Sequence, residues 1–189
     1  FATQKHKVHI ITNGTTLSEK VVEDLMRLRL KSVWGSGLFY MGVSLEGEEA
    51  LHDRITTVPG SFKKTTQGLE KLVARRAELK SNFPLIHLTC VINRGNAREL
   101  VPLYEYANKL GVNVANFVLS SPATYWHGKD YDQDDHLQRP TDPVEEIEPK
   151  LLREQLDLLL EKSKDYKTKL RFSPNYITVD EIVRYYSNK

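Results

Sequence analysis

The apolar run over residues 38–45 closes with Val43-Ser44-Leu45-Glu46-Gly47, and this stretch decides the fold. A run of that length is typical of a β-strand buried on both faces, as in parallel sheets. It stops abruptly at a hydroxyl, a carboxylate and a glycine, which is how such a strand presents polar groups to a ligand. We therefore predict a parallel strand with a binding site at its carboxyl end.

Similar apolar runs recur along the chain and alternate with segments of helical periodicity. The other predicted strands cover residues 8–11, 84–92, 112–119 and 170–173. This alternation is typical of right-handed βαβ units, so we predict an α/β fold of successive parallel βα units. Such a series forms an open sheet, which is either a complete doubly wound domain or an arc of a barrel with a neighbouring segment missing on its amino-terminal side.

Helix boundaries are predicted from side chains that satisfy free backbone groups at helix ends. The signals are the pairs Thr16 with Glu19, Asn96 with Glu99 and Thr178 with Glu181, the starts at Ser61 and Pro149, and the stop at Gly111. They predict helices over residues 17–30 and 179–187, with three others between them. Residues 123–142 form a long polar loop of the kind that covers a site. No linker divides the chain, so we predict one domain over residues 1–189.

Composition excludes several classes of protein. The 189 residues contain 27 Lys and Arg against 25 Asp and Glu, a net charge of +2, which is too balanced for a nucleic-acid partner. Cys90 is the only cysteine, so the chain forms no internal disulfide and no cysteine-rich metal site. No apolar stretch has membrane-spanning length and no signal peptide is recognisable, so we expect a cytoplasmic location. The first residue is Phe1, which indicates a fragment or a processed product.

Polar residues follow four predicted strands. They are Thr12-Asn13-Gly14, Ser44 with Glu46, Asn93 with Asn96, and Ser120 with Ser121. Because the carboxyl ends of parallel strands meet at one edge of the sheet, where ligands bind, we expect these residues to surround a common site.

These strand ends resemble the second half of the core domain of radical S-adenosylmethionine (radical SAM) enzymes. The resemblance covers roughly residues 8–186. It is carried by Ile11-Thr12-Asn13-Gly14, by Val43-Ser44-Leu45-Glu46-Gly47 with His52-Asp53 and Gly60-Ser61-Phe62, and by Val91-Ile92-Asn93 with Asn96. The closing Phe172-Ser173-Pro174, with Glu181-Ile182 and Tyr185-Tyr186, is similar to cores that continue into a SPASM-like accessory domain.

The resemblance implies a partial (β/α)6 barrel that is incomplete at its amino-terminal side. Residues 8–14 correspond to the family's third strand, so the chain covers the core from that strand onward. The family binds a [4Fe–4S] cluster through three cysteines, and the cluster cleaves S-adenosylmethionine reductively to a 5′-deoxyadenosyl radical that abstracts a substrate hydrogen. The cysteine loop is absent here, so the cluster is expected only in the full-length protein. We expect this chain alone to bind S-adenosylmethionine and to be inactive.

The resemblance also implies cofactor-binding residues. Ser44 matches a serine that touches the ribose or carboxylate of the cofactor, and Glu46 stands where the family more often has aspartate. Thr12, Asn13, Asn93 and Asn96 match the neighbouring strand ends, and backbone near Leu119 and Ser120 flanks the adenine. The family's carboxylate-binding arginine position is Thr56 here, so Arg54, two residues earlier, is the candidate.

Simpler roles compete with these. Ser44 could be a buried hydroxyl bonded to backbone, His52 and Asp53 could shape the loop, Asn96 could cap a helix, and Cys90 could be a core residue. The acidic residues Asp130, Asp132, Asp134 and Asp135, with His136, lack the glycine and glutamate of a calcium loop, which favours a solvated loop.

Two other functions stay open. The chain could be a non-catalytic binding or scaffold module without a cluster, or an unrelated barrel enzyme that binds a phosphorylated metabolite. The latter needs a glycine-rich loop at a helix start, and Gly35-Ser36-Gly37 precedes a strand instead. The substrate is not legible from the sequence; the accessory-domain similarity favours a peptide. The strand over residues 8–11 is expected to be an unpaired edge that promotes self-association, which a strictly monomeric mass in light scattering would contradict.

Overall fold

The computed structural model describes residues 2–120 and 146–187. Its centre is one sheet of five parallel strands that follow each other in chain order. They are β1 (Lys7–Thr12), β2 (Gly37–Ser44), β3 (Leu85–Ile92), β4 (Val114–Leu119) and β5 (Lys169–Ser173). The prediction of successive parallel βα units is confirmed. Among the described residues the sheet is open, with β1 and β5 as its edges.

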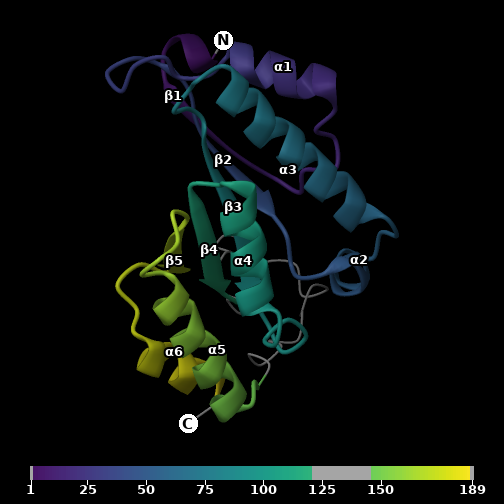
Figure 1. Ribbon diagram of the computed structural model, residues 1–189, viewed down its shortest axis with the longest axis vertical. Helices are drawn as coiled ribbons and strands as arrows, with labels where there is room; N and C mark the ends of the chain where they lie inside the picture. The colour runs from purple at the N-terminus through teal and green to yellow at the C-terminus, as the bar shows by residue number, and fades with distance from the viewer. Residues whose placement is uncertain (1, 121–145, 188–189) are drawn as a thin grey trace, which may run out of the picture.

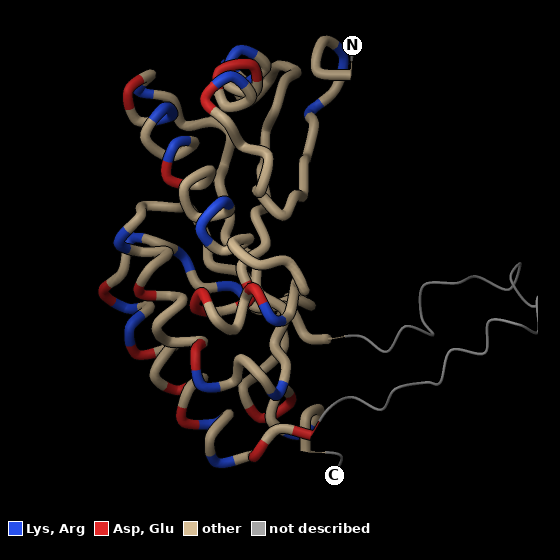
Figure 2. The backbone as a smooth tube through the Cα atoms, turned by 90° about the vertical axis from the view of Figure 1, so that its right-hand side faces the viewer, with Lys and Arg blue, Asp and Glu red and all other residues tan. Residues whose placement is uncertain are grey.

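The connections between strands are helical. The helices are α1 (Glu19–Arg27), α2 (Glu49–Thr56), α3 (Ser61–Glu78), α4 (Leu100–Leu110), α5 (Pro149–Lys162) and α6 (Val179–Tyr186), preceded by the short 3₁₀ helix η1 (Ala2–Gln4). Right-handed crossovers between successive neighbours place the helices on one face of the sheet, as Figures 1 and 2 show. In the described part of the chain, no helix is both long and apolar enough to cross a membrane.

The two faces of the sheet differ in character. The helix-covered face holds the core, with Val43, Leu88 and Phe117 fully buried. The opposite face, called the inner face below, follows from strand alternation and the pairing register. Its residues are Lys7, His9, Ile11, Tyr40, Gly42, Ser44, Leu85, His87, Thr89, Val91, Val114, Asn116, Val118, Lys169, Arg171 and Ser173. This face is mostly polar or small and carries the candidate ligand groups.

Local capping signals succeeded at the end of the chain. Thr178 and Glu181 form the predicted capping box of α6, Pro149 occupies the first turn of α5, and Gly111 ends α4 with a positive φ of 85°. Two other calls lie outside the described residues: the loop over residues 123–142 and its acidic cluster from Asp130 to His136.

The prediction for the first helix is wrong at both ends. Its N-cap is Ser18, which accepts the N–H of Val21, and not Thr16. The helix ends at Arg27 because the next residues pair with the start of β2: Leu38 donates its N–H to the carbonyl of Leu28 and accepts the N–H of Leu30. A contact between distant parts of the chain thus overrides the helical periodicity.

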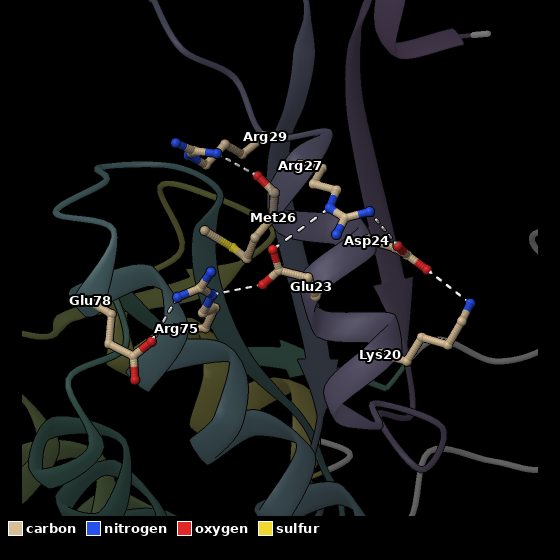
Figure 3. Close-up of polar contacts among 8 residues, drawn as sticks. All are labelled: Lys20, Glu23, Asp24, Met26, Arg27, Arg29, Arg75 and Glu78. Atoms are coloured by element: carbon tan, nitrogen blue, oxygen red, sulfur yellow. Dashed lines mark hydrogen bonds and ion pairs between the residues drawn. The ribbon is translucent and has the colours of Figure 1, made fainter.

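Helices α1 and α3 lie side by side and are joined by an ion pair (Figure 3). Arg75 of α3 donates through Nε to Glu23 of α1 at 2.8 Å and also pairs with Glu78 at 2.9 Å. Helix α3 also lies close to the turn between β1 and α1, and Gly68 of α3 makes this close approach possible. A Cβ built at Gly68 would lie 2.6 Å from Cβ of Leu17 and 2.8 Å from the carbonyl oxygen of Gly14.

Replacement of this glycine tests the packing. Helix propensity alone makes Gly68→Ala stabilising by about 1 kcal/mol. The clash with the backbone of the β1–α1 turn reverses that sign, so we expect a loss of about 1–3 kcal/mol in the free energy of unfolding, measured by urea denaturation. Gln67→Ala, at the exposed neighbouring position, is the control and should change stability by less than about 0.5 kcal/mol. A more stable Gly68→Ala variant would show that α3 does not approach this turn closely.

Candidate functional site

The predicted site residues of the first four strands gather at the carboxyl edge of the sheet, where all five strands point in one direction. Thr12 and Ser44 close β1 and β2, while Asn93 and Ser120 follow the last residues of β3 and β4. Arg54 lies on α2 and is exposed. The structure therefore brings most of the predicted residues to one edge of the sheet.

Ser44 is half-buried on the inner face, beside Thr89 of β3. Its hydroxyl forms no hydrogen bond with any residue that the structure describes. The neighbouring inner-face position on the same strand is Gly42, and the Tyr40 side chain lies over it, with its hydroxyl oxygen 2.8 Å from where a Cβ of residue 42 would stand. The simpler role, a hydrogen bond from the Ser44 hydroxyl to backbone, is thus not found among the described residues, and contact of Ser44 with a cofactor stays a prediction.

Glu46 follows β2 and connects three elements. Its backbone N–H donates to Nδ1 of His52 on α2 at 3.1 Å, and its carboxylate accepts the N–H of Val91 on β3 at 3.0 Å. The Cys90 thiol also hydrogen-bonds to the carboxylate. Burial raises the pKa of Glu46, although the bonds from Val91 and Cys90 oppose this. Glu46 is therefore a half-buried carboxyl group held by hydrogen bonds just after the end of β2.

His52 and Asp53 hold the loops around Glu46. Burial lowers the pKa of His52, and Nδ1 accepts the Glu46 N–H, so the ring is neutral and carries its proton on Nε2. Asp53 accepts the N–H groups of Gly60 and Phe62 at 2.5 and 2.8 Å, at the start of α3. The bond from Phe62 is the largest cause that lowers the pKa of Asp53. These contacts support the simpler role for both residues, which is to shape the loops after β2 and before α3.

Thr56, which the resemblance places at the family's arginine position, is the last residue of α2 and is hydrogen-bonded within α2 and to the start of α3. Its hydroxyl donates to the carbonyl of His52 at 2.8 Å and lies 2.7 Å from the Ser61 hydroxyl. Arg54 forms no hydrogen bond or ion pair with a described side chain. Its role toward a cofactor carboxylate stays a prediction.

Asn96 is fully buried and braces the β3–α4 loop. Its Oδ1 accepts the N–H of Asn93 at 2.9 Å, and its Nδ2 donates to the carbonyl of Val91 at 2.8 Å and to Sγ of Cys90 at 3.3 Å. The prediction that Asn96 and Glu99 cap α4 through their side chains is wrong. Glu99 is the N-cap residue, but its side chain makes no capping bond, because it turns toward α2 instead.

Glu99 was not predicted as a site residue. Its Oε2 accepts the N–H of Glu48 at 2.5 Å, just after Gly47, which has a φ of +152°. The Glu99 carboxylate therefore holds the β2–α2 turn from α4. The partners lie 51 residues apart, and no local pattern in the sequence signals their contact.

Two tyrosines of α6 bind the end of β4. Tyr185 donates its hydroxyl to the carbonyl of Ser120 at 2.5 Å, and the Tyr186 hydroxyl accepts the N–H of Ser120 at 2.8 Å. Tyr186 also donates to the carbonyl of Ile92 at 2.8 Å. Both backbone polar groups of Ser120 are therefore occupied, and Leu119 beside it is 9% exposed. Contact between an adenine and these residues stays a prediction. Because the backbone groups of Ser120 already have partners, such a contact would be made by apolar atoms or by the Ser120 side chain.

Thr12 and Asn13 shape the turn after β1. The Thr12 hydroxyl accepts the N–H of Gly14 at 3.1 Å, and Oδ1 of Asn13 accepts from the N–H and hydroxyl of Thr15 at 3.2 and 2.9 Å. Asn13 is exposed and its amide nitrogen is not bonded to a described residue. Asn13 can therefore donate to a ligand at this edge.

The chain was compared with known proteins. No family model matches it. It is 30% identical over 106 residues to the AdoMet-dependent heme synthase of Methanosarcina barkeri, a stretch that covers 56% of this chain and 26% of the synthase. The chain thus spans about a quarter of that curated relative.

Solved structures extend the similarity to nearly the whole chain. Streptococcus suis SuiB matches with a TM-score of 0.58 at 12% identity, over 92% of this chain and 33% of SuiB. Native anSMEcpe with bound AdoMet matches with a TM-score of 0.54 at 18% identity, over 88% of this chain and 40% of anSMEcpe. Both are radical SAM enzymes. The predicted resemblance to this family is confirmed. The fold is that of the corresponding part of their partial barrels.

The residues present fit the two cofactors of the family unequally. Ser44 and Asn13 offer unbonded polar groups that suit S-adenosylmethionine. A cluster needs three thiolates, whereas the chain has the single Cys90, which is fully buried with a pKa raised well above its ordinary value by burial. Across residues 2–120 and 146–187, no group of His, Cys, Asp and Glu side chains could hold a metal ion. This chain does not supply the cluster ligands.

Titration of Glu46 gives a testable pH dependence. A carboxyl whose pKa in the folded state lies above its ordinary value of 4.5 stabilises the fold below that pH, and the contribution is lost as pH rises through the raised pKa. Glu46→Gln keeps the acceptor for Val91 but does not titrate. We expect the stability of the original chain relative to Glu46→Gln to fall with increasing pH, measured by urea denaturation from about pH 4 to 8.

Glu49→Gln is the control, because it removes one exposed negative charge three residues further along the chain. If the stability of the original chain relative to Glu46→Gln rises with pH instead, the pKa of Glu46 is not raised in the folded state.

Proposed function

We propose that this chain binds S-adenosylmethionine at the carboxyl ends of β1 to β4 as the later part of a radical SAM core. The observation that carries the proposal is the half-buried Ser44 hydroxyl, which has no described partner and stands two residues before Glu46, whose carboxylate is held by the N–H of Val91. The likeness in fold to anSMEcpe with bound AdoMet supports it. Thr12, Asn13, Arg54, Asn93, Leu119 and Ser120 complete the proposed cofactor site, and the buried Asn96 takes part by holding the β3–α4 loop in place.

The residues of the chain would bind and orient the cofactor. The Ser44 hydroxyl can donate to a carboxylate or accept from a ribose hydroxyl, and the Asn13 amide adds a donor at the next strand end. Glu46, with its backbone fixed by His52 and its carboxylate by Val91, keeps the end of β2 in place. A [4Fe–4S] cluster on a segment with three cysteines would supply the electron for reductive cleavage.

The substrate proposed for the full-length protein is a peptide. The support is the similarity of the closing residues to cores with an accessory domain, together with the likeness in fold to anSMEcpe, which has been solved with a bound peptide. A cytoplasmic location and self-association through the edge strand β1 stay predictions.

Binding of S-adenosylmethionine to the chain tests the proposal. We expect Ser44→Ala to weaken binding by roughly two- to tenfold in isothermal titration calorimetry, because a neutral hydrogen bond contributes about 1 kcal/mol. Ser36→Ala is the matched control: Ser36 is half-buried like Ser44, precedes the opposite end of β2, where its hydroxyl donates to the carbonyl of Gln4, and should leave the affinity unchanged. Equal affinities for the original chain and Ser44→Ala would remove Ser44 from the site, and no binding by either would refute the proposal for this chain.

The cluster is tested separately through iron and acid-labile sulfide after anaerobic reconstitution. We expect none bound by this chain, because it has one cysteine, and a cluster bound by the full-length protein through a three-cysteine loop. Absence of a cluster from the full-length protein would refute the radical reaction and favour the non-catalytic binding module.

A further inference from the structure

A row of four polar side chains crosses the inner face from the proposed cofactor site to the far edge of the sheet. Ser44 pairs with Thr89, Thr89 with Asn116, and Asn116 with Arg171. Paired residues of parallel strands project to the same face. Two hydroxyls, an amide and a guanidinium therefore lie in line on β2, β3, β4 and β5.

Asn116 is fixed but retains donors. It is 8% exposed, and its Oδ1 accepts the hydroxyl of Ser173 at 2.8 Å. The amide nitrogen of Asn116 is bonded to no described residue, and it has two N–H groups. The bond from Ser173 leaves this nitrogen as the free end of the side chain, so Asn116 can donate to a ligand.

Arg171 brings an uncompensated positive charge to the row. Its Nε donates to Oδ1 of Asn175 at 3.0 Å, and it forms no ion pair with a described residue. Its charge acts on His87, which lies two strands away, about 10 Å at ordinary strand spacing. The guanidinium therefore acts across the inner face. None of the inner-face residues defined above is acidic, so the face does not neutralise this charge.

His87 lies beside the row on the same face, two residues nearer to the amino end of β3 than Thr89. It is 6% exposed, and its Nδ1 has no hydrogen-bond partner among the described residues. Burial, with a smaller contribution from the charge of Arg171, lowers the pKa of His87 to about 4, so the ring is neutral at pH 7. The Tyr40 ring packs edge-on against the imidazole, with the ring centroids 4.4 Å apart, so this nitrogen is enclosed by protein atoms and His87 supports the inner face without contacting a ligand.

We propose that Thr89, Asn116 and Arg171 bind a carboxylate group of the substrate. A guanidinium pairs with a carboxylate through two parallel hydrogen bonds, and the Asn116 amide and Thr89 hydroxyl add neutral donors beside it. The proposal rests on the proposed function, because it places the substrate on the same face as S-adenosylmethionine. It names the substrate class as a molecule with a free carboxylate, such as a peptide with an acidic side chain or a free carboxyl terminus.

The test uses butyrate as the probe and butyramide as its neutral counterpart of the same size. In ¹H–¹⁵N NMR titrations of the chain, we expect butyrate, and not butyramide, to shift the backbone amides of Thr89, Asn116 and Arg171. Arg171→Gln should weaken butyrate binding by about tenfold or more, because hydrogen bonds to charged groups are worth about 1.5–3 kcal/mol. The side chain of Arg171 is exposed, so the variant should fold.

Lys169→Gln is the matched control, because it removes a positive charge from the same strand and the same face, two residues away. An equal loss of affinity in both variants would overturn the proposal in favour of general charge attraction. Equal shifts with butyramide would overturn it too, as would tighter binding of inorganic phosphate than of butyrate, which would identify a phosphate site.

S-adenosylmethionine titrated into the same chain separates this proposal from the proposed function. Binding of S-adenosylmethionine without binding of butyrate overturns the carboxylate site alone. Binding of butyrate at these residues without binding of S-adenosylmethionine keeps the carboxylate site and removes the cofactor role.

Discussion

The hydrogen bonds around Glu46 are the constraint on which the candidate site depends. The backbone N–H of Glu46 bonds to His52 on α2, and its carboxylate accepts the N–H of Val91 at the end of β3. One residue thus ties a helix to two adjacent strands. Glu99, at the start of α4, adds a further bond: its carboxylate accepts the N–H of Glu48, two residues after Glu46. Ser44, two residues before Glu46, is itself held by the pairing of β2 with β3, so these bonds fix the chain that directly follows it.

The strands were predictable because each contains a short run rich in apolar and β-branched residues, and that signal is local. Capping was predictable where both partners lie within one helical turn, as with Thr178 and Glu181. It failed where two candidates of the same chemistry stand close together: Ser18 caps α1, although Thr16 offers the same hydroxyl. It also failed where Glu99 found a partner on a distant element.

The site was predictable only as a set of strand ends. The sequence places Ser44, Glu46 and Asn96 near one edge, but their different settings come from contacts that cross the sheet. Both polar groups of the Asn96 side chain are hydrogen-bonded to the backbone of Val91 and Asn93, whereas the Ser44 hydroxyl is bonded to no described residue. Arg171 joins Ser44 in one row through the pairing register of four strands. Register is a property of the folded sheet, which a reading of motifs along the chain does not give.

The separation of charge between Glu46, just after β2, and Arg171 on β5 orders the two proposed ligands. Glu46 lies at the end of β2, and Arg171 lies three strands away on β5, roughly 14 Å at ordinary strand spacing. The positive sulfonium of S-adenosylmethionine is favoured near the acidic side chain and disfavoured near the guanidinium, while a substrate carboxylate has the opposite preference. Neutral Thr89 and Asn116 lie between them. A substrate held by its carboxylate at β5 would therefore extend back toward the cofactor at β2, so that one row of side chains sets both its position and its direction.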